Sequence, residues 1–138
     1  MKTVLCIEDV AANVVVIAGV CKGLNLNLEL AVNGREGLEK VRELHPSLVL
    51  LDIGLPDMDG LEVVHHIRED IDPTVAQVPV IAVTAHALNG DRERCLDAGC
   101  DDYLAKPYRV RDLVALFNTM LNPVAVPKPS AQGTLDKA

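Results

Sequence analysis

Several kinds of residue are scarce in this sequence of 138 residues. It has no tryptophan, and its aromatic side chains are Tyr103, Tyr108 and Phe117, too few for a surface on which nucleic-acid bases stack. No apolar run approaches the roughly 18 residues of a membrane-spanning helix. The first apolar stretch meets Glu8 and Asp9 too early for a signal peptide. We therefore expect a cytoplasmic protein that binds neither nucleic acid nor membrane.

Paired cysteine motifs are also missing. None of the four cysteines, Cys6, Cys21, Cys95 and Cys100, is spaced as in a CxxC motif. Cys6 and Cys21 lie within apolar patterns, where cysteine behaves as a small core residue. We expect reduced, structural thiols in a reducing compartment, with no disulfide, zinc or redox role.

The charge balance is acidic, with 20 acidic and 13 basic residues and a net charge of −7. Residues 123–138 contain Lys128 and Lys137 against Asp136, a balance of +1 that leaves −8 on residues 1–122. Such a body repels a phosphate backbone, a second argument against nucleic-acid binding. Length and composition fit one globular domain. We place this domain at residues 1–122 and a proline-containing, disordered tail at 123–138.

Short apolar runs alternate with segments of helical pattern along the chain. The runs predict strands over 3–7, 26–32, 48–51, 78–83 and 102–105, and the segments between them predict helices near 11–23, 34–44, 60–69, 87–97 and 109–121. The first, third and fourth runs are continuously apolar, which is typical of strands buried on both faces. The second alternates, as an edge strand does. This order predicts an α/β fold with a parallel sheet and helices on both faces.

Polar side chains collect where the predicted strands end. Glu8 and Asp9 follow the first strand, Asp52 the third, Thr84 the fourth and Lys106 the fifth. Ligands of open parallel sheets bind beyond the carboxyl ends of the strands, so we expect these side chains to converge. Three carboxylates need counter-charge, which the lysine and an oxygen-liganded Mg²⁺ would supply. A carboxylate placed there can attack phosphorus and form an acyl phosphate.

Five motifs surround these side chains, at residues 4–9, 52–60, 80–85, 98–104 and 106–107. In this order and spacing they resemble the receiver domains of two-component response regulators, and the resemblance covers about residues 2–121. It implies a flavodoxin-like (βα)₅ fold with strand order 2-1-3-4-5. It also implies a signalling domain rather than an enzyme, which accepts a phosphoryl group from a histidine kinase or a histidine phosphotransfer protein in a phosphorelay.

The resemblance implies a metal site and a phosphoacceptor. Asp52 would be the phosphoacceptor, and Mg²⁺ or Mn²⁺ would be bound by Asp9, Asp52 and the main-chain carbonyl of Gly54. Glu8 would act through a metal-bound water. Most members of the family have Asp where this sequence has Glu8, and the longer side chain alters that water bridge.

Further roles follow from the same resemblance. Thr84 and Lys106 would hold the phosphoryl group, with a cis bond between Lys106 and Pro107. Thr84 and Tyr103 would form the switch, Thr84 moving toward the phosphoryl group and the ring turning inward behind it. Gly54 and His86 occupy the positions that tune the lifetime of the phosphoryl group. Since Gly54 has no side chain to position water, we expect a lifetime that is not unusually short.

The expected output is a protein contact. A downstream target would bind the face formed by residues 86–121, and we expect no separate output domain in this chain. Three alternatives stay open. The chain could be a receiver excerpted from a hybrid kinase or longer regulator, although Met1 directly precedes the first strand. A haloacid-dehalogenase-like phosphatase would need a second Asp where Gly54 lies. A phosphorylation-independent pseudo-receiver is disfavoured by the complete set of acidic, Thr and Lys side chains.

Overall fold

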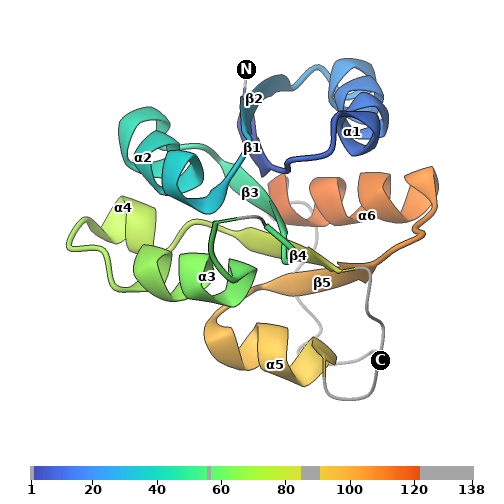
Figure 1. Ribbon diagram of the computed structural model, residues 1–138. Helices are drawn as coiled ribbons and strands as arrows, with labels where there is room; N and C mark the ends of the chain where they lie inside the picture. The colour runs from blue at the N-terminus through green and yellow to red at the C-terminus, as the bar shows by residue number, and fades with distance from the viewer. Residues whose placement is uncertain (1, 56, 85–90, 122–138) are drawn as a thin grey trace.

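The computed structural model describes residues 2–55, 57–84 and 91–121. These residues form one parallel sheet in the order β2-β1-β3-β4-β5, with helices on both faces (Figure 1). The predicted flavodoxin-like fold is thus confirmed. Along the chain the elements are β1 (Thr3–Ile7), α1 (Ala11–Gly23), β2 (Asn27–Ala31), α2 (Gly34–Leu44), β3 (Leu48–Asp52), α3 (Gly60–Arg68), α4 (Pro73–Ala76), β4 (Val80–Thr84), α5 (Asp91–Ala98), β5 (Asp102–Ala105) and α6 (Val110–Leu121).

The sheet separates two hydrophobic cores. Successive side chains of a strand point to opposite faces, and in β1 Val4 and Cys6 join the core beneath α1 and α6, while Leu5 and Ile7 join the core beneath α2, α3 and α5. Figure 1 shows α1 and α6 on one side of the sheet and the other helices opposite. Both faces are covered, which explains why β1, β3 and β4 are continuously apolar.

β2 is an edge strand, as its alternating pattern predicts. It pairs in parallel with β1 alone, and Leu30 is 40% exposed on it. The strand is shorter than the predicted 26–32, because pairing with β1 runs only from Asn27 to Ala31. Among the described residues, no helix is both long and apolar enough to cross a membrane.

Two local predictions need correction. The predicted helices did not include the short helix α4, which follows α3: the Asp72 carboxylate accepts a hydrogen bond from the Thr74 N–H at 2.9 Å, and Pro73 occupies the first turn. The fourth strand begins at Val80 rather than at residue 78. The cause is a tertiary contact, in which the Val78 carbonyl accepts a hydrogen bond from the Arg68 guanidinium at 2.7 Å.

Other predictions lie outside the described residues. They concern the start of the predicted helix at 87–97, the lifetime position His86 and the tail at 123–138. Within the described part, α5 ends at Ala98 and Gly99 follows with φ +115°, a left-handed conformation that glycine adopts without strain. Gly99 therefore ends this helix.

Candidate functional site

The site lies at the carboxyl ends of the strands, beside the point where β1 pairs with β2 on one side and β3 on the other. Backbone pairing continues just past the strand ends. The Glu8 N–H donates to the Ala31 carbonyl at 2.9 Å, and the Lys106 N–H donates to the Thr84 carbonyl at 2.8 Å. These bonds fix the backbone of the residues that carry the polar side chains.

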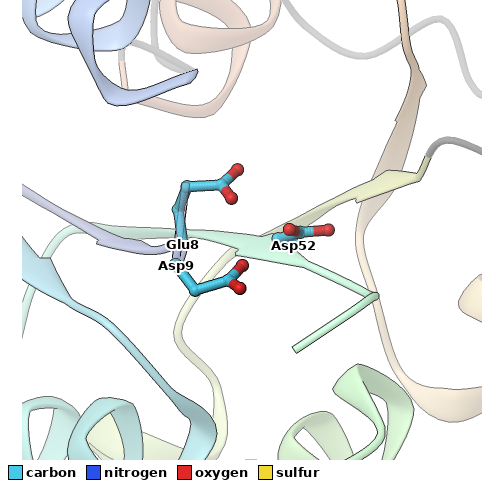
Figure 2. A group of neighbouring side chains, drawn as sticks. All are labelled: Glu8, Asp9 and Asp52. Carbon is cyan, nitrogen blue, oxygen red and sulfur yellow. The ribbon is translucent and has the colours of Figure 1, made fainter. Parts of the chain in front are cut away.

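Three carboxylates converge at this edge. Each of Glu8, Asp9 and Asp52 offers an oxygen atom, and these atoms all lie within 4.8 Å of one another. Figure 2 shows Glu8 and Asp9 projecting from the end of β1 toward the side on which Asp52 lies. Glu8 is 6% exposed, Asp52 is partly buried and Asp9 is exposed. The predicted acidic group is therefore assembled, with one open side.

Lys106 supplies positive charge to this group. Its Nζ atom lies 3.5 Å from Glu8 Oε1 and 3.9 Å from Asp52 Oδ2. Burial raises the pKa of Glu8, the neighbouring Asp52 carboxylate raises it further, and the Val10 N–H and Lys106 act in the opposite direction. One ammonium beside three carboxylates leaves an excess of negative charge.

A divalent cation fits this donor set. All three side chains offer oxygen, which Mg²⁺ and Mn²⁺ prefer over softer ligands. The Gly54 N–H donates to Asp52 Oδ1 at 3.0 Å, so the Gly54 main chain lies beside the carboxylates. A Cβ atom at Gly54 would lie 3.9 Å from that Oδ1, an ordinary contact, so space alone does not require glycine there.

The remaining predicted site residues occupy neighbouring strand ends. Thr84 is the last residue of β4, is 3% exposed and pairs with Ala105. Tyr103, on β5, is partly buried and packs against the core beneath α2, α3 and α5. The Lys106-Pro107 bond is cis, as the resemblance implies. His86 and Ala85 lie outside the described residues.

Sequence reasoning missed an apolar groove that borders the site. It is lined by Asn13, Val16, Lys106, Pro107, Tyr108 and Val110. A second groove, which shares Val16 and Val110 with the first, includes Val15, which is 70% exposed. The signal was present in the sequence, since α1 contains three consecutive valines at 14–16 and has no acidic residue in its first turn. A helix at the protein surface normally carries polar side chains on its exposed face.

The sequence model described as the response regulator receiver domain matches residues 4–118. The chain belongs to this family. Receiver domains act in two-component signalling, and this receiver domain is similar to receivers found both inside larger kinases and as small separate proteins.

Two curated relatives illustrate this range. The signal transduction histidine-protein kinase BarA of Escherichia coli K12 is 40% identical over 108 residues, which are 76% of this chain and 11% of BarA. The polar-differentiation response regulator DivK of Brucella ovis is 35% identical over 120 residues, 87% of this chain and 96% of DivK. The chain thus spans a small part of BarA and nearly all of DivK.

Solved structures agree. The receiver domain of the sensor histidine kinase PA1611 from Pseudomonas aeruginosa PAO1 superposes with a TM-score of 0.79 at 33% identity, covering 88% of this chain and 98% of that one. That structure has a magnesium ion coordinated in its active site cleft. A CheY-like receiver domain protein from Methanospirillum hungatei gives a TM-score of 0.79 at 29% identity, covering 89% and 95%.

Proposed function

We propose that this receiver domain accepts a phosphoryl group on Asp52 from the phosphohistidine of a histidine kinase or a histidine phosphotransfer protein. The observation that carries this proposal is the convergence of Glu8, Asp9 and Asp52, with oxygen atoms within 4.8 Å of one another, beside Lys106. A partly buried acidic cluster with one lysine has the charge of a site for a divalent cation and a phosphoryl group.

The transfer is a displacement at phosphorus. An Asp52 carboxylate oxygen forms the new O–P bond while the P–N bond to the donor histidine breaks, and the histidine nitrogen keeps the electron pair. Lys106 and the Thr84 hydroxyl would donate hydrogen bonds to the phosphoryl oxygens as charge develops on them. Such donors act best when they are held in place before the reaction.

A bound Mg²⁺ or Mn²⁺ would supply the positive charge that lets a carboxylate approach an anionic phosphoryl group. Asp9, Asp52 and the Gly54 carbonyl would hold the cation directly, and Glu8 through a water. The resemblance to the magnesium-bound PA1611 receiver supports this assignment. Burial, first, and then the neighbouring Asp52 carboxylate raise the pKa of Glu8, and a bound cation would favour its ionised form.

The output would be a change of a protein-binding surface. Phosphorylation adds about −1.5 to −2 charge units, and Thr84 and Tyr103 would respond as the switch. A downstream protein would bind the face formed by residues 86–121. Gly54 and His86 would set the lifetime of the phosphoryl group. We expect a lifetime that is not unusually short, and loss of label within seconds after removal of the donor would contradict this.

The decisive test is labelling of Asp52. Wild type and Asp52→Asn are incubated with Mg²⁺ and a small phosphodonor, and the phosphorylated fraction is measured by intact mass. Wild type gains one phosphoryl group and Asp52→Asn gains none, while Asp112→Asn, which changes an exposed carboxylate on α6, labels like wild type. Equal labelling of wild type and Asp52→Asn contradicts the proposal, and multiple turnover of an unrelated phosphate ester would favour a phosphatase.

The donor protein would cover the apolar groove on α1, because Lys106 lines both this groove and the acidic group. A donor histidine that reaches Asp52 brings its surrounding surface over this rim. We predict that Val15→Asp, in the neighbouring groove on the same helix, slows phosphotransfer from a phosphorylated histidine kinase about tenfold, as loss of a contact that contributes more than about 1 kcal/mol does. Labelling by a small phosphodonor stays unchanged.

The control for this prediction is Ile71→Asp, at an apolar residue that is 94% exposed beyond the end of α3. It should leave both reactions unchanged. If Val15→Asp and Ile71→Asp have the same rate with the kinase, α1 is not the donor surface.

A further inference from the structure

Helix α2, which contributes no side chain to the acidic group, holds the connection between β3 and α3 through two hydrogen bonds. Asp57 Oδ1 accepts a hydrogen bond from the Gly34 N–H at 2.8 Å, and Asp57 Oδ2 accepts one from the Arg35 N–H at 3.0 Å. Both donors belong to the first turn of α2, where N–H groups have no partner within the helix. These two bonds lower the pKa of Asp57, and the bond from Gly34 has the larger effect. The Asp57 carboxylate is therefore ionised at neutral pH.

The helix has a separate cap of its own. Asn33 Oδ1 accepts a hydrogen bond from the Glu36 N–H at 2.8 Å, and Glu36 Oε1 accepts one from the Val32 N–H at 2.8 Å. This is a reciprocal arrangement of the capping-box type. Because α2 can begin without Asp57, the contact from Asp57 constrains the connection as well as the helix.

The same connection is fixed at its base. The Gly60 N–H donates to the Ile53 carbonyl at 3.1 Å, and a Cβ atom at Gly60 would lie 2.6 Å from Ile53 Cα. Next to Asp57, Met58 fills the space beside Gly34, where a Cβ atom would lie 2.6 Å from Met58 Cγ. Contacts therefore hold this connection at Ile53 and again at Asp57 and Met58, and Gly54 lies between these two points.

We propose that Asp57 is a positioning residue for the cation site: by holding the β3–α3 connection against the first turn of α2, it fixes the Gly54 main chain beside the carboxylates of Asp9 and Asp52. Asp57 touches neither the cation nor the phosphoryl group. This inference rests on the proposed function, and it names the contact that keeps one proposed cation ligand, the Gly54 carbonyl, in place.

One consequence is reciprocal coupling. If the Asp57 contact favours the cation-binding arrangement, cation binding must favour the Asp57 contact by the same factor. Mg²⁺ should therefore slow hydrogen exchange of the Gly34 and Arg35 amides, although both belong to a helix that supplies no ligand. This readout requires no phosphorylation.

The test uses the full chain and Mg²⁺ alone. Mg²⁺ binding is measured by calorimetry and by the amide shift of Gly54 in wild type, Asp57→Ala, Asp57→Asn and Asn33→Ala. We expect Asp57→Ala to raise the half-saturating Mg²⁺ concentration about three- to tenfold, the factor that one net hydrogen bond contributes to an equilibrium. Asp57→Asn keeps one acceptor oxygen and should lie between wild type and Asp57→Ala.

Asn33→Ala is the matched control, because it removes the cap of the same helix without touching the connection. It should bind Mg²⁺ within about twofold of wild type. Equal affinity of wild type and both Asp57 variants, or equal weakening by Asn33→Ala and Asp57→Ala, overturns the inference. If Asp57→Ala does not fold, the comparison of Asp57→Asn with Asn33→Ala decides. Absence of Mg²⁺ binding by wild type would contradict the proposed function itself.

Discussion

Arg68 joins segments that lie far apart in the sequence. Its Nε donates to the Gly99 carbonyl at 2.8 Å, Nη1 donates to the carbonyls of Ala76 and Val78 at 2.8 and 2.7 Å, and Nη2 lies 2.9 Å from Asp101 Oδ2. The guanidinium group therefore satisfies three backbone carbonyls in one plane, which the single ammonium of lysine does not reproduce.

We predict that Arg68→Lys lowers the free energy of unfolding by about 2 kcal/mol, since partly buried carbonyls lose their donors. Urea unfolding followed by circular dichroism measures the change. The control is Arg92→Lys at an exposed position of α5, which should change the free energy by less than about 0.5 kcal/mol. Equal effects at the two positions would show that the contacts of Arg68 contribute little.

Glu8 shows the cost of gathering acidic groups. Its pKa is raised above the ordinary value of 4.5, first by burial and then by Asp52. The folded protein thus binds this proton more tightly than the unfolded chain does, and stability falls as the pH rises from about 4.5 toward the native pKa. Above that window, the ionised Glu8 opposes folding unless a cation compensates.

We predict that Glu8→Gln unfolds at higher urea than wild type at pH 7 in the presence of a chelator. The difference should shrink at pH 4, where Glu8 is protonated in both states. Added Mg²⁺ should stabilise wild type more than Glu8→Gln. If the difference in stability between wild type and Glu8→Gln stays constant with pH, the shape of the side chain, and not its charge, causes that difference.

At the scale of elements, two helical glycines have opposite surroundings. A Cβ atom at Gly37 of α2 would lie 2.4 Å from Ile7 Cδ1 and 2.9 Å from its Cγ1, and Ile7 is fully buried. A Cβ atom at Gly19 of α1 would meet nothing within 4 Å. Helix propensity favours alanine at both positions, so packing alone separates them.

We predict that Gly19→Ala raises the free energy of unfolding by about 0.5–1 kcal/mol, the helical advantage of alanine over glycine. Gly37→Ala should lower it by about 1 kcal/mol, because overpacking of about 1–3 kcal/mol exceeds that advantage. Chemical denaturation of both variants checks this. Stabilisation by both substitutions would show that the core beneath α2 adjusts freely.

At the scale of the whole molecule, thiols report on both cores. Cys6 and Cys21 belong to the core between the sheet and helices α1 and α6, whereas Cys95 and Cys100 lie on the opposite side of the sheet; all four are buried and none forms a disulfide. Burial raises the pKa of Cys6 and of Cys100 to about 12 and that of Cys21 to about 11. Reactive thiolate is therefore scarce in the folded protein.

We predict that iodoacetamide labels these thiols only upon unfolding, and that all four share one urea midpoint. The reason is that the sheet belongs to both cores, so one core cannot open without exposing the other. Mass spectrometry of labelled peptides over a urea series measures each thiol. Labelling of Cys95 and Cys100 at lower urea than Cys6 and Cys21 would reveal separate unfolding of the two layers.

Much of this architecture follows from local pattern. The continuous runs at β1, β3 and β4, and the alternation in β2, reflect burial on two faces or one, which is set by position in the sheet. Because side chains at the ends of parallel strands share one edge, the grouping of Glu8, Asp9 and Asp52 followed from the order of the strands. The helix α4 was missed because its cap is a short acidic stretch with little periodicity.

The sequence alone determined the order of the elements, the edge strand and the identity of the acidic group, because these depend on residue type and spacing along the chain. Tertiary structure alone decided where β4 begins, how deeply Glu8 is buried and which helix holds Asp57. Each of these depends on contacts between segments distant in the sequence, whose distances no local pattern encodes.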